Sequence, residues 1–266
     1  MKNNICISIS EKPGNFGKII HNAGYEALGL NWIYIPFKIT NLEDTIKGIR
    51  ALGIRGCSVS MPFKEKVIKF LDDIDPLANE IGSVNTIVNN NGILKGYNTD
   101  FLGFQKSFKK LGAMKHQKIL ILGTGGVSKS ILLGLKKLKF KNIFISGRNF
   151  CNTKNLALKY NVKFIEWDQR ENSNFNILIN ATPIGMKPLT TSMPVSKNFI
   201  KSLQCVFDVI ANPKETKLIK TAKDLKIKNQ GGYLMALNQG VIQFKLYTCK
   251  NAPIKEMEKS LRRNMI

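Results

Sequence analysis

A glycine-rich turn between an apolar strand and a helix restricts the fold of this chain more than any other feature. Residues 118–135 have the sequence KILILGTGGVSKSILLGL, in which Gly123, Gly125 and Ser128 form a G-x-G-x-x-S pattern. The first glycine permits a tight turn, the second lets the backbone approach a pyrophosphate, and the small serine allows close helix–strand packing. A helix N-terminus also favours a bound anion. The stretch predicts a Rossmann-type dinucleotide site, and a glycine-rich turn in an ordinary α/β fold is the alternative.

The next predicted strand indicates which dinucleotide is bound. NAD enzymes usually place Asp or Glu at the end of this strand, where the carboxylate binds the ribose 2′-hydroxyl. Here residues 142–149 have the sequence NIFISGRN, with no acidic residue and with Arg148 after the strand. A guanidinium can bind a 2′-phosphate through its planar fork. The pattern favours NADP over NAD, although Arg148 could instead be a solvated loop residue.

Strand-like and helix-like segments alternate along the whole chain, which predicts an α/β fold with parallel sheets. In the first hundred residues, Asn41 is the expected N-cap of a helix that ends near Gly53. Another helix is expected to begin at Pro62, and residues 83–100 predict a hairpin that turns at Asn90-Asn91-Gly92. After a helical link at 101–113, the alternation restarts at the glycine-rich turn. The other predicted strands are 4–10, 31–37, 56–61, 162–167, 175–182 and 204–210, and the other predicted helices are 16–30, 234–248 and 254–264.

The formal net charge is +23 over 266 residues. A charge of this size favours nucleic-acid binding, but the lysines are spread along the whole chain rather than gathered in one block, and the aromatic residues are not interleaved with them. We therefore interpret the charge as a lysine-rich bias that would still attract an acidic metabolite or a polyanionic cofactor. No apolar run is long enough to span a membrane. The N-terminus shows no signal peptide, so we expect a cytoplasmic protein that binds neither nucleic acid nor membrane.

The few cysteines and histidines exclude several classes of site. The five cysteines are scattered and never form a C-x-x-C pair, which is typical of reduced thiols rather than a disulfide framework. With only His21 and His116 present, neither a histidine-based triad nor a multi-histidine metal site is expected. We predict no metal.

Polar side chains follow three strand ends in the first hundred residues. Lys64 comes after the strand in SVSMPFKE, Asn85 lies in SVNTIV, and Asp100 closes GYNTD. Each has an ordinary structural explanation, because a lysine near a helix start is usually solvated and Asn-Thr-Asp before a helix is often an N-cap. Together they could form one polar site.

These motifs carry a family resemblance. SVSMPFKE, SVNTIV and GYNTD resemble the motifs of the shikimate dehydrogenase family, and the later segments GTGGVS, SGRN, INATPIGM and GG…MALNQ match it in order. The resemblance covers essentially the whole chain. The segments EKPGNFG, ALGIRGC and SVNTIVN are most similar to the divergent shikimate dehydrogenase-like group.

The resemblance implies an α/β protein with two domains. An N-terminal substrate domain at 1–101 would be completed by C-terminal helices at 237–266 that pack back on it, and residues 102–236 would form a Rossmann domain for NADP. The enzyme would be a monomer or homodimer acting in aromatic amino acid biosynthesis, and its substrate would be a small hydroxylated ring acid.

Site residues follow from the same resemblance. Lys64 would be the acid/base group and Asp100 its partner. Substrate contacts would come from Ser60, Asn85, Gln239 and Asn15. The cofactor contacts would be Gly123, Thr124, Gly125, Gly126, Val127, Arg148, Thr182, Val209, Gly232 and Met235.

The family reaction interconverts shikimate plus NADP and 3-dehydroshikimate plus NADPH. Reduction of a ketone by hydride creates an alkoxide, so an ammonium such as that of Lys64 can donate a proton as charge develops. The alternatives are an NADP-dependent dehydrogenase of a different hydroxylated ring acid and a catalytically idle NADP-binding regulatory protein. An idle site would have little need for both Lys64 and Asp100.

The chain departs from the family where the substrate carboxylate is bound. The family uses two serines and a tyrosine, and the matching positions here are Asn15, Gly17 and Ala211. Each lost hydrogen bond to a charged group costs roughly 1.5–3 kcal/mol. Asn15 can still donate through its amide, and Lys18 either reaches inward or faces solvent. We therefore expect low activity on shikimate itself.

Overall fold

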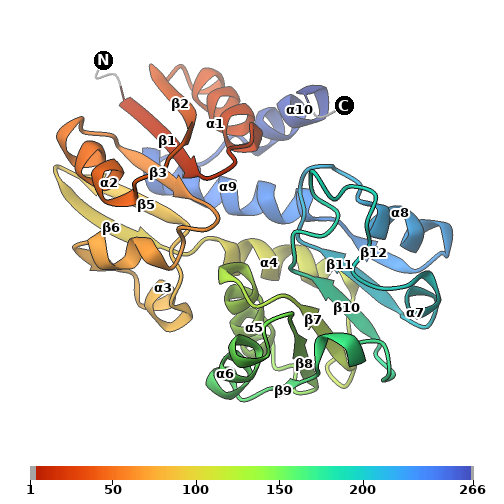
Figure 1. Ribbon diagram of the computed structural model, residues 1–266. Helices are drawn as coiled ribbons and strands as arrows, with labels where there is room; N and C mark the ends of the chain where they lie inside the picture. Colours follow the sequence, from red (N-terminus) through yellow and green to blue (C-terminus); the bar gives the residue numbers. More distant parts are fainter. Residues whose placement is uncertain (1–3, 265–266) are drawn as a thin grey trace. The chain divides into compact units, whose positions relative to one another are not determined.

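The structure is a computed structural model that describes residues 4–264, and these residues divide into two compact units. The first unit contains the described residues up to Thr99 together with those from Gln239 onward, and the second contains residues 100–238. Both units are of mixed α/β type (Figure 1). Within residues 4–264, no helix has the length and apolarity needed to cross a bilayer.

The first unit is built on a six-stranded sheet with the order β2-β1-β3-β5-β6-β4. Strands β1, β2 and β3 are parallel, whereas β5 pairs antiparallel with both β3 and β6. The strands are β1 (Asn4–Ser10), β2 (Trp32–Lys38), β3 (Gly56–Val59), β4 (Asp73–Ile74), β5 (Thr86–Asn90) and β6 (Ile93–Tyr97). The helices are α1 (Phe16–Ala27), α2 (Leu42–Ala51), the 3-10 helix η1 (Lys66–Phe70), α3 (Pro76–Ile81) and α10 (Ile254–Asn264), together with the part of α9 (Gly232–Thr248) from Gln239 onward.

The period-two alternation of its strands gives this sheet two different faces. On one face, Cys57 and Val59 of β3 join Ile87 of β5 in an apolar core with α2, η1 and α3. On the other face, Gly56 lies so close to Tyr247 of α9 that a Cβ atom would come within 2.3 Å of the tyrosine ring. Helices α1 and α10 lie side by side in this unit (Figure 1). Polar side chains on the α9 side of β3 and β5 are therefore placed against helix α9.

Two local predictions for the first unit are confirmed. The side chain of Asn41 accepts a hydrogen bond from the backbone N–H of Asp44, which is the expected N-cap of α2. The hairpin of β5 and β6 turns at Asn91 and Gly92, which have φ values of 53° and 92°. These left-handed values are the ones that Asn and Gly tolerate best.

The second unit is built on a six-stranded sheet with the order β12-β11-β10-β7-β8-β9, in which every pair is parallel. The strands are β7 (Ile119–Leu122), β8 (Ile143–Ser146), β9 (Lys163–Phe164), β10 (Ile177–Asn180), β11 (Cys205–Asp208) and β12 (Lys228–Gln230). The helices are α4 (Asp100–Phe108), η2 (Lys109–Leu111), α5 (Gly126–Lys137), α6 (Phe150–Tyr160), η3 (Trp167–Gln169), α7 (Lys197–Lys201), α8 (Lys217–Asp224) and the first turns of α9.

The core strands of this sheet, β7, β10 and β11, are buried along their whole length, as in sheets covered on both faces. Leu120, Leu178 and Val206 pack in one apolar cluster with side chains of α7 and α8. Helices α4 and α5 lie side by side, and Gly134 of α5 allows Phe104 of α4 to approach closely. The predicted parallel sheet is thus confirmed for this unit.

The structure corrects two sequence expectations and adds elements that were not predicted. The first sheet is mixed rather than parallel, because the β5–β6 hairpin inserts antiparallel strands. Short elements without a clear pattern were not predicted, among them β4, α3 and β12. The helix expected from Pro62 is wrong: residues 61–65 form turns, and only the 3-10 helix η1 follows.

Candidate functional site

Lys64 lies in the irregular segment between β3 and η1. The backbone N–H of Ser60 donates to the carbonyl of Ile9, and that of Phe63 donates to the carbonyl of Ser60. The Lys64 carbonyl accepts a hydrogen bond of 2.8 Å from the N–H of Val84. A regular helix would need that carbonyl for the residue four positions on, so this long-range bond explains why no α-helix begins here. Lys64 is half-buried and Ser60 is exposed.

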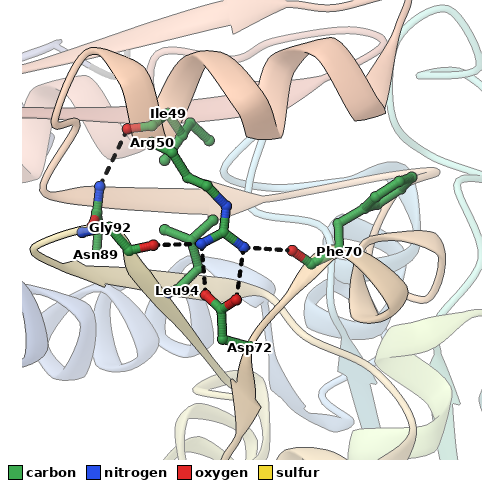
Figure 2. Close-up of polar contacts among 7 residues, drawn as sticks. All are labelled: Ile49, Arg50, Phe70, Asp72, Asn89, Gly92 and Leu94. Atoms are coloured by element: carbon green, nitrogen blue, oxygen red, sulfur yellow. Dashed lines mark hydrogen bonds and ion pairs between the residues drawn. The ribbon is translucent and has the colours of Figure 1, made fainter.

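The chain beyond η1 is fixed by the guanidinium of Arg50 (Figure 2). Its Nη1 lies 2.6 Å from Oδ2 of Asp72 and its Nη2 lies 3.1 Å from Oδ1, which is a bidentate ion pair. Nη2 also donates to the carbonyl of Phe70, and Nη1 donates to that of Gly92 in the hairpin turn. Arg50 holds the pKa of the Asp72 carboxyl below its usual range. The segment that carries Lys64 is therefore anchored at both ends.

Asn85 and Gln239 are far apart in the chain but lie in direct contact in the first unit. The Asn85 Nδ2 donates to Gln239 Oε1 at 3.3 Å and to Thr99 Oγ1 at 2.9 Å. The Thr99 backbone N–H and the Thr86 hydroxyl both donate to Asn85 Oδ1 at 2.8 Å. The structure thus brings together two of the predicted substrate contacts at the ends of β5 and β6.

Asp100 is the first residue of α4 and is only 6% exposed. It follows Thr99 directly in the chain, at the point where the second unit begins. Lys64, Ser60, Asn85 and Gln239 belong to the first unit. The pairing of Lys64 with Asp100 stays a prediction.

The segment expected to bind a carboxylate has few polar groups to offer. Asn15 is exposed, precedes α1 and makes no capping hydrogen bond with its side chain. A Cβ atom on Gly17 would lie 2.8 Å from the Tyr34 hydroxyl. Tyr34 is buried and stacks on His21 with ring centroids 4.6 Å apart, so it cannot easily move. Tyr34 therefore occupies space that a serine at position 17 would need, and Lys18 is exposed.

The glycine-rich turn has the geometry of a dinucleotide site. Gly123 has φ +110°, and a Cβ atom there would lie 2.7 Å from the Ala181 carbonyl oxygen, so only glycine fits. A Cβ atom on Gly125 would meet nothing within 4 Å, which leaves room for a ligand to approach the backbone. Helix α5 begins at Gly126, and Val127 lies in its first turn. The Ser128 hydroxyl is buried without a hydrogen-bond partner in residues 4–264.

Arg148 follows β8 and is exposed. It lines a cavity of about 320 Å³ at the end of β8 together with Gly147, Phe150, Thr153, Ile165, Glu166, Trp167 and Asp168. Thr124 of the glycine-rich turn packs against Gly147, where a Cβ atom would lie 2.7 Å from the threonine methyl group. The turn and Arg148 are thus adjacent, and these groups fit a phosphorylated dinucleotide. The carboxylates of Glu166 and Asp168 in the same cavity would oppose a phosphate.

Of the remaining predicted cofactor residues, Thr182 and Val209 follow the carboxyl ends of β10 and β11, and Gly232 and Met235 lie in the first turns of α9. The Thr182 hydroxyl donates to Asn180 Oδ1 at 2.7 Å, and the Val209 N–H donates to the Asn180 carbonyl at 3.0 Å. Gly232 lies against Val209, where a Cβ atom would come within 2.2 Å of the carbonyl oxygen. Met235 is buried one turn further along α9.

Asp208 was not predicted as a functional residue, yet its carboxylate connects the end of β10 with the loop after β11. Its carboxylate accepts hydrogen bonds from the Thr216 hydroxyl at 2.7 Å, from the Ile210 N–H at 3.1 Å and from Asn180 Nδ2 at 3.1 Å. Burial raises the pKa of Asp208 to about 6, although these donors oppose the shift. Gln243 was also missed. The available signal was its place one helical turn after Gln239.

Across residues 4–264, no cluster of three or more His, Cys, Asp or Glu side chains has the arrangement of a metal site.

Comparisons with known proteins identify the family. The shikimate dehydrogenase substrate binding domain matches residues 16–87, and shikimate / quinate 5-dehydrogenase matches residues 105–229. The shikimate dehydrogenase-like protein of Haemophilus influenzae is 43% identical over 246 residues, which cover 92% of this chain and 90% of that protein. The shikimate dehydrogenase (NADP(+)) of Caldanaerobacter subterraneus subsp. tengcongensis is 39% identical over 240 residues, covering 86% of each. A solved shikimate dehydrogenase in complex with NADP+ has a TM-score of 0.89 at 33% identity and covers 99% of this chain and 96% of that chain.

These matches confirm the resemblance stated from the motifs, and they confirm the predicted fold class. Shikimate dehydrogenases are NADP-dependent oxidoreductases that act on a CH–OH group, which is the predicted enzyme class with the predicted cofactor. The chain belongs to the shikimate dehydrogenase family.

Proposed function

We propose that this protein is an NADP-dependent dehydrogenase that interconverts shikimate and 3-dehydroshikimate, with low activity on shikimate. The single observation that carries the proposal is the hydrogen bond between Asn85 and Gln239, because it joins two of the family's substrate-contact positions over 154 residues of sequence. We assign substrate binding to the first unit and NADP binding to the second. The family matches at residues 16–87 and 105–229 support this division.

In this proposal NADP supplies the hydride acceptor, and its reduced form supplies the hydride. Gly123 and Gly125 leave the turn open for the pyrophosphate, and Arg148 binds the 2′-phosphate. The Lys64 ammonium donates a proton from Nζ to the substrate oxygen as negative charge develops there, and the neutral amine takes it back in the oxidation. Asp100 holds the Lys64 amine in place. Asn85 and Gln239 orient the hydroxylated ring.

Low activity on shikimate follows from the residues around the expected carboxylate position. Gly17 has no hydroxyl to offer, and the buried Tyr34 fills the adjacent space. Ala211 replaces the tyrosine of the family. Asn15 and Lys18 are the remaining candidates for binding the carboxylate, and both are exposed. The alternative is that this chain is an NADP-dependent dehydrogenase of a different hydroxylated ring acid.

The test is a comparison of NADP-dependent oxidation of shikimate, quinate and analogues that lack the carboxylate. We expect slow turnover of shikimate and a smaller than usual loss when the carboxylate is removed. Asn15→Ala and Lys18→Ala, measured separately, identify which side chain binds the acid, and Lys12→Ala is a matched exposed control. Tight, fast turnover of shikimate that neither Asn15→Ala nor Lys18→Ala affects would contradict the proposed carboxylate site.

A further inference from the structure

A continuous chain of buried hydrogen bonds runs from helix α9 to the Asn85–Gln239 contact. Gln243 lies one helical turn after Gln239, and its side chain is 3% exposed. Its Nε2 donates to the Thr86 hydroxyl at 2.9 Å, and the Thr86 hydroxyl donates to Asn85 Oδ1 at 2.8 Å. Asn85 in turn donates to Gln239 at 3.3 Å. Gln243 is thus connected to Gln239 through two adjacent residues at the start of β5.

Backbone groups fix the direction of two amides in this chain of bonds, those of Asn85 and Gln243. The Thr99 backbone N–H can only donate, so the Asn85 atom that faces it at 2.8 Å must be the oxygen. The Asn85 carbonyl can only accept, so the Gln243 atom that faces it at 3.4 Å must be the nitrogen. Neither amide can turn over without leaving a buried donor against a donor or an acceptor against an acceptor.

The other end of Gln243 is held by hydroxyl groups. The Ser58 hydroxyl donates to Gln243 Oε1 at 3.1 Å, and the Tyr34 hydroxyl donates to Ser58 at 2.8 Å. Because Ser58 has one hydrogen, the Tyr247 hydroxyl at 3.1 Å must be a donor to Ser58 as well. The Ser58 hydroxyl therefore donates one hydrogen bond, to Gln243, and accepts two, from Tyr34 and Tyr247. All donors in the series point from the tyrosines toward Gln239.

The direction of these hydrogen bonds determines which atom of the Gln239 amide is left to bind a ligand. Its Oε1 accepts from Asn85 Nδ2 at 3.3 Å and from the Thr99 hydroxyl at 3.1 Å. The acceptor of this amide is thereby used within the protein, whereas Nε2 makes no hydrogen bond to any residue from 4 to 264. Gln239 is half-buried, so its Nε2 remains accessible to a ligand.

We propose that Gln243 and Thr86 are positioning residues that act through Asn85 to hold the Gln239 amide with its two N–H donors toward the substrate. Gln239 then recognises a ligand oxygen that accepts hydrogen bonds, such as a keto, carboxylate or alkoxide oxygen, and cannot serve as the acceptor for a ligand hydroxyl. The inference rests on the proposed function, because it assumes that Gln239 contacts the substrate.

The first test uses two substitutions at Thr86 and a control. Thr86→Val keeps the shape of the buried side chain and removes its hydroxyl, whereas Thr86→Ser keeps the hydroxyl. Thr248→Val is the matched control, because the Thr248 hydroxyl is half-buried in the same unit and bonds only to backbone groups. Nuclear magnetic resonance of ¹⁵N-labelled protein measures hydrogen exchange of the Asn85 side-chain amide. We expect exchange to be about tenfold faster or more in Thr86→Val, and Thr86→Ser and Thr248→Val to stay close to wild type.

The second test replaces the Gln243 amide with a carboxyl group. In Gln243→Glu, the ionised carboxylate cannot donate to Thr86, but the protonated acid can. We expect kcat/KM for the best ring acid to fall about 10- to 100-fold at neutral pH, and to recover toward wild type as the pH falls and the introduced carboxylate takes up a proton. A structural role alone would lower activity without adding this pH dependence.

Two results would overturn the inference: Asn85 exchange in Thr86→Val equal to that in Thr248→Val, or a pH profile of Gln243→Glu with the shape of the wild-type profile. The exchange measurement needs no turnover. If the wild type binds NADPH but oxidises none of the ring acids, the proposed function fails, and the exchange rates still decide whether Thr86 fixes Asn85. If Thr86→Val does not fold, Thr86→Ser and the pH profile of Gln243→Glu decide.

Discussion

The backbone N–H of Thr99 donates to Oδ1 of Asn85 over 2.8 Å, and this bond sets the direction of a polar cluster that reaches Gln239. Both residues are buried, so the cost of reversing the amide would be that of unsatisfied buried polar groups. A side chain at the start of β5 is thus oriented by the backbone that leads from β6 into α4.

Asn85→Asp tests the direction of the cluster. The aspartate can still accept from Thr99 and Thr86, but it presents an oxygen to the Gln239 oxygen in place of a donor. We expect kcat/KM to fall about 100-fold, because the Gln239 amide would turn its donors inward. Asn90→Asp is the control at the other end of β5, since Asn90 is exposed and accepts from Arg55. Equal losses in the two variants would contradict the assignment.

Arg148→Gln tests the choice of cofactor. Removing the guanidinium should raise KM for NADP about 10- to 100-fold, as expected for a lost charge-assisted hydrogen bond, and leave KM for NAD nearly unchanged. Lys154→Gln on α6 is the control for loss of an exposed positive charge in the same unit. If both KM values rose together in Arg148→Gln, Arg148 would not contact the 2′-phosphate.

His21 should make the first unit sensitive to acid. Burial lowers the pKa of His21 to about 3 from the ordinary value of 6.5. The unfolded chain binds a proton between these values and the folded chain does not, so the free energy of unfolding rises with pH across this window. At pH 5 the loss relative to pH 7 is about 2 kcal/mol. Trp32 is the tryptophan of the first unit and Trp167 that of the second. Denaturation of the Trp167→Phe variant, followed by Trp32 fluorescence, therefore measures the free energy of unfolding of the first unit at each pH.

His21→Phe should remove this part of the pH dependence and keep the ring stacked on Tyr34. The same loss between pH 7 and pH 5 in His21→Phe would show that other groups cause the acid sensitivity.

Asp208 should give the second unit the opposite trend. Its pKa is raised to about 6 from 3.8 by burial, so the folded state holds a proton that the unfolded state has released. The Asp208 contribution to the free energy of unfolding therefore falls as the pH rises from about 4 to 6, by about 2 kcal/mol. Fluorescence of Trp167 in Trp32→Phe follows this unit. The difference between this protein and its Asp208→Asn variant should show the fall, and a difference that is flat or rises with pH would contradict it.

The parts of the fold that could be predicted from sequence are those set by local chemistry. The apolar strand before Gly123, the N-cap at Asn41 and the turn at Asn91-Gly92 depend on residues close in the chain. The irregular backbone at Lys64 could not be predicted in this way, because the bond from Val84 that replaces the helix comes from a segment twenty residues further along the chain.

Two of the polar residues in the candidate sites were missed for a related reason. Gln243 and Asp208 are each flanked by apolar residues in the sequence. Only the folded chain shows which groups form hydrogen bonds with them. The family motifs named residues that could contact ligands, and they gave no signal for residues that act through a neighbour. The direction of the hydrogen bonds at Gln239 depends on backbone groups beside β5 and β6 and so required coordinates.

The most direct test of the central claim is the rate of NADP reduction by Lys64→Met, measured with the best ring acid found for the wild type. Lys66→Met is the control, because Lys66 is exposed and lies two residues further on. Loss of a proton-transferring group should lower kcat about a hundred- to ten-thousand-fold in Lys64→Met, with NADPH binding unchanged and Lys66→Met close to wild type. A kcat for Lys64→Met that equals that of Lys66→Met would contradict the assignment of Lys64 as the acid/base group.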